Sequence, residues 1–435
     1  MDKEIKERIA AINSGIIPEG YKKTKVGIVP VEWENKKLQK VCSKIIAGAT
    51  PSTKIGDYWN GNIRWMSSGE INKKIICDTD TKITQLGYDS CSTKTIPEKC
   101  VLIALAGQGK TRGMVAYNLV PICTNQSLAS LIPNDIFYLY LYYYLDSQYQ
   151  NLRSVSSGDG SRGGLNLEII SNYNIIIPPL PEQQNIAEIL STQDKLIELQ
   201  EKKIEQLKEL KKAYLQKMFP KKGSKYPELR FRGFTDPWEQ RKLGEVIEDS
   251  YNGQTPSRAN DEYWNGDLNW LASGDLNRGI VTHTTEKITN KGLEDTRLRI
   301  VPKGTFVMAI TGLEAAGTRG NCGILGIDTA LNQSCMALFP NKKILDTKFL
   351  FQWYRKVGEE YGINYTQGTK QQSYNAELIQ ILPISFPNKE EQQKIADYFS
   401  NLDSLITLHQ RKSEQEKQKK KALMQLLLTG IVRTK

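Results

Sequence analysis

Short apolar and alternating runs, separated by Gly, Pro, Asn and Ser, fill positions 21–181 of the chain. The run 101–105 predicts a buried strand, and 173–177 predicts another that ends at Pro178-Pro179. Between them, residues 137–145 have the apolar density and the length of a buried helix. The pattern therefore predicts a mixed α/β domain.

After position 181 the chain becomes highly charged, and seam positions, mostly apolar, recur at alternating steps of four and three. This is the heptad spacing of a coiled coil, and it returns after position 389. Each stretch of about 38 residues would form a helix of about 57 Å, too long to pack on one small domain. The two helices are expected to pair with each other, antiparallel, because a globular domain lies between them. The apolar seam consists of Ile186, Leu190, Ile197, Ile204, Leu207, Tyr214 and Met218, then Ile395, Phe399, Leu402, Ile406, Leu423 and Leu427.

Polar residues interrupt the second seam at His409, Ser413, Glu416 and Lys420. They would weaken the helix pair, or else they face another subunit. The sequence leaves both interpretations open.

The chain also contains one long internal repeat, whose shift grows from 205 to 207 and then 209 positions. The insertions fall between motifs, where loops tolerate them. Such a duplication favours two α/β domains related by a pseudo-two-fold axis. The matching segments are Thr50-Pro51-Ser52 with Thr255-Pro256-Ser257, Tyr58-Trp59-Asn60-Gly61 with Tyr263-Trp264-Asn265-Gly266, Asn125-Gln126-Ser127 with Asn332-Gln333-Ser334, and Glu182-Gln183-Gln184 with Glu391-Gln392-Gln393.

These patterns divide the chain into five segments. They are an N-terminal helical segment (1–20), a first α/β domain (21–180), a first long helix (181–222), a second α/β domain (223–388), and a second long helix with a tail (389–435).

Composition is that of an ordinary soluble protein, with 435 residues, 39% of them hydrophobic and 25% charged. The net charge of +11 suits a polyanionic partner such as nucleic acid. No apolar run reaches the roughly 18 residues of a membrane span, and the N-terminus lacks a secretory signal. A cytoplasmic protein without membrane association is expected.

Metal binding and catalysis both lack candidate residues. The seven cysteines form no Cys-x-x-Cys pair, and His283 and His409 are the only histidines, so no metal site is predicted. Residues 104–111 fit a relaxed phosphate-loop pattern, but 112–117 reads as a strand where such a loop needs a helix. Neither histidine has a counterpart in the other copy, and the Asn/Asp-Pro-Pro-aromatic motif of DNA methyltransferases is missing. We expect no catalytic residue.

Ligand recognition is expected where the two copies differ. The shared Tyr-Trp-Asn-Gly motif is interpreted as domain core, because residues that read two different targets should diverge. Arg and Lys suit guanine and phosphate, whereas Gln and Asn suit adenine. The candidate DNA-binding residues are Thr50, Ser52, Lys54, Lys110, Arg112, Ser161 and Arg162 in the first copy, and Thr255, Ser257, Arg258, Arg278, Arg319, Gln367, Thr369, Lys370 and Gln371 in the second.

Together these motifs resemble the specificity subunits of type I restriction-modification systems. The resemblance rests on Thr-Pro-Ser, Tyr-Trp-x-Gly and Trp-x-x-Ser-Gly in each copy, and on 180–187 (Leu-Pro-Glu-Gln-Gln-Asn-Ile-Ala), which begins the first long helix. The second copy departs from the family at 388–393, where the proline is lost. The resemblance covers essentially the whole chain.

The resemblance implies two target-recognition domains that each read one half of a bipartite DNA site. The paired helices would set the spacing and dock the modification (methyltransferase) subunits, of which two are implied, in a complex with ATP-dependent restriction subunits. S-adenosylmethionine, ATP and Mg²⁺ would belong to those partners, with no cofactor in this chain. The resemblance assigns the following residues to the subunit-interface helices: Ile186, Leu190, Ile197, Ile204, Leu207, Ile395, Phe399, Leu402, Ile406 and Leu423.

Two other functions remain open from the residues alone. A self-sufficient DNA methyltransferase is disfavoured by the missing motifs. A coiled-coil scaffold without DNA contact is disfavoured by the basic charge and the paired domains.

Overall fold

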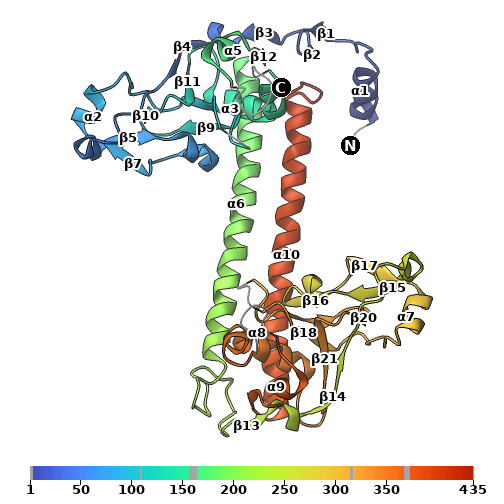
Figure 1. The fold of residues 1–435 in the computed structure, drawn as a ribbon. Helices are drawn as coiled ribbons and strands as arrows, with labels where there is room; N and C mark the ends of the chain where they lie inside the picture. The colour runs from blue at the N-terminus through green and yellow to red at the C-terminus, as the bar shows by residue number, and fades with distance from the viewer. Residues whose placement is uncertain (1–2, 108–109, 156–163, 314–316, 367–372, 435) are drawn as a thin grey trace. The chain divides into compact units, whose positions relative to one another are not determined.

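The computed structural model describes residues 3–107, 110–155, 164–313, 317–366 and 373–434. The chain forms two compact units (Figure 1): unit one is Met1–Leu199 with Ser413–Lys435, and unit two is Gln200–Lys412. Each unit combines sheets and helices, which confirms the expected mixed α/β class. Both unit boundaries fall inside the long helices α6 (Leu180–Lys217) and α10 (Lys389–Leu427). Each long helix therefore contributes one part to each unit.

A five-stranded sheet with the order β4-β11-β8-β9-β6 forms the centre of unit one. Its neighbouring strands are antiparallel, except that β6 runs parallel to β9. Smaller sheets have the orders β10-β5-β7, β1-β2 and β12-β3. The strands are β1 (Tyr21–Thr24), β2 (Gly27–Pro30), β3 (Glu34–Lys37), β4 (Cys42–Ala47), β5 (Trp59–Met66), β6 (Ile75–Ile76), β7 (Thr81–Ile83), β8 (Val101–Ala104), β9 (Val115–Asn118), β10 (Cys123–Thr124), β11 (Leu128–Pro133) and β12 (Asn174–Ile177).

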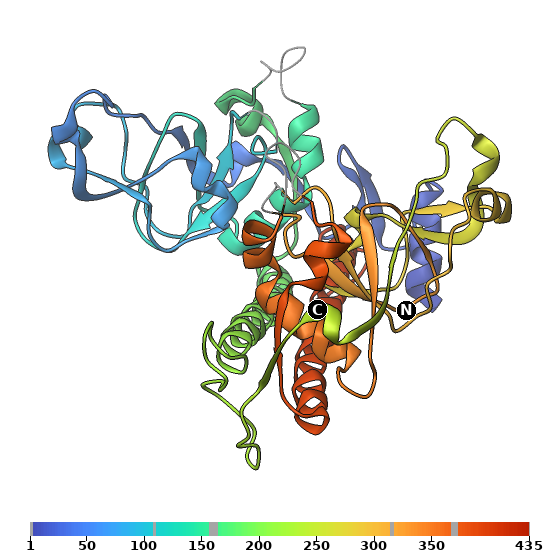
Figure 2. The same cartoon turned by 60° about the horizontal axis from the view of Figure 1, so that its bottom comes forward.

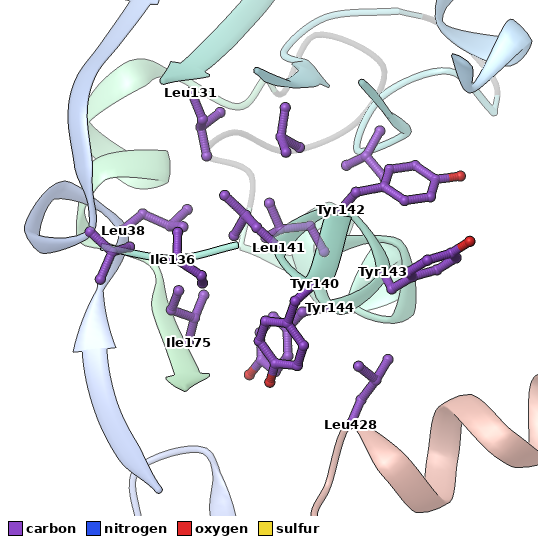
Figure 3. Packing of buried hydrophobic residues seen from close by; sticks show 14 of the residues in the cluster. Leu38, Leu131, Ile136, Tyr140, Leu141, Tyr142, Tyr143, Tyr144, Ile175 and Leu428 are labelled. Atoms are coloured by element: carbon purple, nitrogen blue, oxygen red, sulfur yellow. The ribbon is translucent and has the colours of Figure 1, made fainter. Parts of the chain in front are cut away.

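A tyrosine-rich helix supplies much of the core of unit one. Residues 140–145 of α3 are all buried. The segment is helical, although its many aromatic residues would also suit a strand. Figure 3 shows these rings beside Leu38, Ile175 and Leu428, the last from just beyond α10. The predicted strands 101–105 and 173–177 and the predicted helix 137–145 are confirmed as β8, β12 and α3. The shorter helices are α1 (Lys3–Asn13), α2 (Gln85–Asp89), α3 (Tyr138–Ser147), α4 (Tyr149–Ser154) and α5 (Leu167–Asn172).

Unit two repeats this plan. Its sheets have the orders β14-β21-β18-β19-β16, β17-β15-β20 and β13-β22, which match the corresponding sheets of unit one strand for strand. The strands are β13 (Glu239–Lys242), β14 (Ile247–Asn252), β15 (Trp264–Leu271), β16 (Gly279–Val281), β17 (Glu286–Ile288), β18 (Phe306–Ala309), β19 (Cys322–Leu325), β20 (Ala330–Leu331), β21 (Cys335–Pro340) and β22 (Pro383–Phe386), and the helices are α7 (Asn290–Asp295), α8 (Thr347–Asn364) and α9 (Ala376–Gln380).

The small three-stranded sheet lies on the side of each unit that is farthest from the long helices. Figures 1 and 2 show this for β5 and β7 with α2 in unit one, and for β15 and β17 with α7 in unit two. The five-stranded sheet lies between this outer part and the long helices. Its loops are therefore held by packing on both sides.

The repeated Tyr-Trp-Asn-Gly motif supports the core of the small sheets, but it is only partly buried: its tryptophan is half-buried and its asparagine is exposed. Trp59 packs edge-on against Trp65 at 5.3 Å between ring centroids, and Trp264 packs in the same way against Trp270 at 5.1 Å. Gly61 has no room for a side chain, since an added Cβ would lie 2.4 Å from the Ile83 carbonyl oxygen. The motif is repeated because packing requires it.

The repeated Glu-Gln pair at the start of each long helix is buried and fixes the helix to its unit. Gln183 accepts a hydrogen bond from the Phe137 backbone N–H (2.8 Å) and donates to the Pro178 carbonyl (2.8 Å). Gln392 makes the equivalent bonds to Asp346 N–H and the Pro387 carbonyl, each at 2.8 Å. A buried amide with both ends paired costs little to desolvate.

The predicted heptad seam is the contact surface between α6 and α10, which run antiparallel in each unit. Ile186, Leu190, Ile395 and Phe399 are at most 1% exposed, and Ile204, Leu207, Leu402 and Ile406 are also buried. Ile197 and Leu423 are half-buried. In unit one Asp194 accepts from Lys420 Nζ at 2.6 Å, and in unit two the repeat-related Asp403 pairs with Lys211.

The interpretation that the polar seam residues face another subunit is wrong for three of the four. Glu416 accepts from Gln193 Nε2 at 2.5 Å, and His409 Nδ1 lies 2.7 Å from Gln200 Oε1. Lys420 pairs with Asp194. Polar residues occur at matching seam positions on both helices, so Glu416, His409 and Lys420 each find a partner inside the pair. Ser413 is buried as well.

The C-terminal tail closes unit one through a buried carboxylate. Arg433 donates to Glu182 from Nε (2.8 Å) and Nη2 (2.9 Å), while Trp33 Nε1 and Thr434 N–H donate to the same carboxylate. Burial alone raises the pKa of Glu182, but these hydrogen bonds outweigh it and hold the pKa below its ordinary value. The carboxylate therefore stabilises unit one when it is ionised.

We predict that Arg433→Met lowers the free energy of unfolding by roughly 2–3 kcal/mol at pH 7, because it leaves a buried carboxylate without its cation. Since the folded-state pKa is lowered, the stabilisation is present above the unfolded value of 4.5 and is lost as pH falls through the folded value. Urea unfolding across pH 3 to 7 measures this. The exposed pair Arg64–Asp78 supplies the control, Arg64→Met, with an expected change within about 0.5 kcal/mol. Equal effects of the two substitutions would contradict the prediction.

Candidate nucleic-acid interface

Three loops of unit one meet at one edge of the five-stranded sheet. Strand β4 ends where β11 begins, with Ala47 opposite Ala129, and β8 ends at the same edge, with Ala104 opposite Leu128. The edge therefore carries residues 48–55 after β4, 125–127 before β11, and 105–107 with 110–113 after β8. We call these loops the loop edge. The backbone N–H of Leu165 joins them by donating to the Leu105 carbonyl at 3.0 Å.

Unit two has a loop edge of the same construction. Residues 253–260 follow β14, 332–334 precede β21, and 310–313 with 317–321 follow β18. Tyr374 N–H donates to the Ile310 carbonyl at 2.8 Å, as Leu165 does to Leu105 in unit one. Between the strand ends and the Thr-Arg-Gly motifs, the unit-two loop is longer by two residues, so the two edges share a frame but differ in their loops.

The Thr-Pro-Ser motif joins the loops of each edge. Thr50 Oγ1 donates to Gln126 Oε1 at 2.6 Å, and Thr255 donates to Gln333 Oε1 in the same way. The Ser52 carbonyl accepts from Trp59 Nε1 at 3.1 Å, and the Ser257 carbonyl accepts from Trp264 Nε1 at the same distance. The threonines therefore hold the turn before β11 or β21, and the serine backbones hold the small sheets.

Three basic candidates of unit one, Lys54, Lys110 and Arg112, belong to its loop edge. Lys54 and Lys110 are exposed, and Arg112 is half-buried. The backbone carbonyl of Lys110 accepts from the Tyr149 hydroxyl at 2.6 Å, and that of Arg112 accepts from Arg153 at 3.2 Å. Helix α4 therefore holds the backbone at Lys110 and Arg112. The ammonium groups of Lys54 and Lys110 remain on the surface.

The arginines of unit two are held by protein groups. Arg258 pairs with Glu286, with Nη2 at 2.9 Å from Oε2, and its guanidinium lies 3.8 Å from the Trp264 ring centroid. Hydrogen bonding to Arg258 lowers the pKa of the Glu286 carboxyl. An open pocket of about 520 Å³ adjoins this pair. In unit one, Thr53 and Thr81 stand in place of Arg258 and Glu286, so this pair is specific to unit two.

Arg278 and Arg319 lie together at the loop edge of unit two. Arg278 Nη2 donates to the Arg319 carbonyl at 2.5 Å, and Arg319 Nε donates to the Leu313 carbonyl at 2.8 Å. Both arginines therefore also order the loop after β18. The remaining candidates, Ser161, Arg162, Gln367, Thr369, Lys370 and Gln371, lie outside the described residues.

The sequence reasoning missed Gln126 and Gln333 as individual candidates. Both are exposed at the centre of their loop edge. Their signal was the repeated Asn-Gln-Ser motif, which by sequence favours a structural or DNA-facing polar turn. The spatial contact with Thr50 or Thr255 is what distinguishes them.

The apolar seam of the subunit-interface helices pairs the two helices with each other, as the heptad spacing predicts. The seam residues are buried or half-buried within the chain itself, against the other long helix. A partner must use another face of these helices.

No helix among the residues that the structure describes is long and apolar enough to cross a membrane. The same residues contain no group of three or more His, Cys, Asp or Glu side chains arranged to hold a metal ion.

Two copies of one α/β unit, each with a loop edge and a share of an antiparallel helix pair, define a duplicated two-domain class of protein. The model of the type I restriction modification DNA specificity domain matches twice, at residues 30–209 and 235–418. The chain belongs to this family.

Named relatives cover most of the chain. It is 27% identical over 418 residues to the type I restriction enzyme MjaVIII specificity subunit of Methanocaldococcus jannaschii, which covers 94% of each protein. The MjaIX specificity subunit of the same organism is 26% identical over 314 residues, 69% of this chain and 71% of the relative. The EcoR124I/EcoR124II specificity subunit of Escherichia coli is 28% identical over 195 residues, 41% of this chain and 48% of the relative.

Solved structures share the fold. A chain from a study of complex assembly and conformational transition of the type I R-M system superposes with a TM-score of 0.57 at 16% identity, covering 93% of this chain and 99% of that one. The type I restriction-modification S subunit from M. genitalium gives a TM-score of 0.56 at 14% identity, covering 93% and 96%.

We predict that Gly48→Ala disrupts the loop edge of unit one. An added Cβ would lie 1.7 Å from the Thr124 carbonyl oxygen, so the backbone must move, and we expect a loss of more than about 2 kcal/mol of stability. Thermal unfolding measures it. Gly56→Ala is the matched control, because nothing lies within 4 Å of its added Cβ and its change should stay within about 0.5 kcal/mol. An unchanged melting temperature for Gly48→Ala would refute the close approach.

Proposed function

We propose that this chain is the sequence-specific DNA-binding subunit of a type I restriction-modification complex. Each unit reads one half of a bipartite site with its loop edge. The observation that carries the proposal is the pair of loop edges, which share one frame but differ in loop length and in basic residues. Relatives named as specificity subunits along 94% of their length support it. Two different readers on one frame suit two unequal half-sites.

Chemistry belongs to the partners in this proposal. This chain has no catalytic residue, and it directs adenine methylation by modification subunits and cleavage by restriction subunits. S-adenosylmethionine, ATP and Mg²⁺ act in those partners, and the complex works on DNA in the cytoplasm. The alternative of a self-sufficient methyltransferase requires methyl transfer by the purified chain alone. Sequence-independent, salt-insensitive DNA binding by the assembled complex would instead favour a scaffold without DNA contact.

A second stripe of apolar residues supports docking of two partner subunits. In unit one Ile189, Leu196 and Leu199 of α6 are 38%, 40% and 60% exposed. In unit two Leu405 and Leu408 of α10 are 43% and 45% exposed, and they are the repeat equivalents of Leu196 and Leu199 at a shift of 209. This spacing of seven and three is again a heptad seam. The outward stripes therefore offer one helix-binding site in each unit.

We predict that exchanging residues 21–180 for the same region of a relative changes one half of the recognised site and leaves the other half intact. The physical reason is that all loops of the unit-one edge lie in this region, whereas the unit-two edge lies outside it. Sequencing of methylated adenines in a host that carries the complete system measures the outcome. An unchanged site would refute the assignment of reading to the unit-one loop edge.

We predict that Leu196→Lys and Leu405→Lys each remove one modification subunit from the complex, and that the double substitution removes both. A lysine in a seam between helices must bury its charge or break the contact. Native mass spectrometry of the co-expressed complex counts the subunits. Leu86→Lys, at a leucine that is 65% exposed on α2, is the control and should keep the full complement. If the double variant keeps both modification subunits, the stripes are not their docking sites.

A further inference from the structure

One side-chain pair is the same in both loop edges although their loops differ. Thr50 donates to Gln126 across 76 positions of sequence, and Thr255 donates to Gln333 across 78. The two glutamines are exposed at the surface of their edges. Both copies have this hydrogen bond, although the second copy has two extra residues between its threonine and its glutamine.

The turn that carries each glutamine is rigid. Asn125 accepts from Ser127 N–H through its side chain at 3.2 Å, and its own N–H donates to the Met66 carbonyl at 3.1 Å. Asn332 makes the same bonds to Ser334 N–H (3.0 Å) and the Leu271 carbonyl (2.9 Å). Such a side-chain turn fixes the backbone locally. The position of each glutamine is thus set before any ligand arrives.

A glycine fixes the threonine side of the pair. Gly48 precedes Thr50 by two positions, and Gly253 precedes Thr255 by two. A Cβ at Gly253 would lie 1.8 Å from the Leu331 carbonyl oxygen, and a Cβ at Gly48 would lie 1.7 Å from the Thr124 carbonyl oxygen. Both glycines bring the loop after β4 or β14 against the turn, so the threonine reaches the glutamine from a fixed backbone.

The hydrogen bond from threonine orients the glutamine amide. With Oε1 held by the threonine hydroxyl, Nε2 presents its two N–H donors to solvent. Within the described part of the chain, neither Nε2 has a hydrogen-bond partner. Reading adenine with glutamine uses the oxygen and the nitrogen together. The threonine bond occupies one of the two lone pairs of Oε1, so the Nε2 donors are the main free groups of the glutamine, and N–H donors suit phosphate oxygens.

We propose that Gln126 and Gln333 bind the DNA sugar-phosphate backbone and set the position of each unit on its half-site. Two units that read different bases have only the backbone in common, so a group kept identical in both contacts what the half-sites share. The residues that differ between the edges then read the bases. This inference rests on the proposed DNA-binding function.

Gln126→Glu in the full complex tests the proposal, because a carboxylate still accepts from Thr50 but repels phosphate. The probes are a duplex with the bipartite site mapped from methylated adenines, and a duplex of equal length with both half-sites scrambled. We expect Kd to rise more than about tenfold for both duplexes, with the mapped bases unchanged. Gln333→Glu should give the same result.

Gln39→Glu is the matched control. Gln39 is exposed in unit one, and its substitution adds the same charge. It lies at the opposite end of β4 from the loop edge, about 20 Å away. Its Kd should rise less than about threefold. Thermal unfolding of each variant confirms that the fold is kept. Gln126→Ala should weaken binding by about tenfold with an unchanged slope of log K against log salt, because glutamine is neutral.

The outcomes separate the two proposals. A wild-type complex without sequence-specific binding refutes the proposed function. If the wild-type complex binds its site but Gln126→Glu and Gln39→Glu behave alike, the pair is only a structural link between loops. A changed base in the mapped site would make Gln126 a base reader. Either of the last two results overturns this inference and leaves the proposed function standing.

Discussion

Each long helix is buried partly in the unit that the other repeat copy builds, and the rest of the structure depends on this burial. The core of unit one contains Leu427 and Leu428 from the second copy. The core of unit two contains Ile204, Leu207 and Phe219 from the first. Each core therefore contains residues from both repeat copies. The reciprocal ion pairs Asp194–Lys420 and Asp403–Lys211 act at the same contact, where a shifted register would leave a buried charge unpaired.

This exchange explains which residues stayed identical after duplication. The Trp pairs, the buried Glu-Gln pairs and the glycines at close backbone contacts all carry packing that admits no other residue. The exposed side chains of the loop edges, such as Lys54 and Lys110, carry no such restriction. One frame can therefore hold two different readers, and a change in a loop need not disturb the core.

The polar interior of the helix pair has a cost and a use. Paired amides and ions contribute less stability than leucines would, but they accept only one partner geometry. Gln193 with Glu416 and Gln200 with His409 lie where an all-apolar seam would allow the helices to slide. The outward leucines at 196 and 405 remain on the surface because the inward seam already satisfies the pair.

The sequence by itself determined the duplication, the α/β character of each copy, the two long helices and the motifs of the core, because these depend on local periodicity and on spacing along the chain. It also located the polar loops at Thr50, Lys110 and Arg319. Only the tertiary structure decided that Glu416 and Lys420 face inward, that Arg258 is paired with Glu286, and that Thr50 holds Gln126. Those outcomes are contacts between residues far apart in sequence, and no local pattern specifies the partner of a polar side chain.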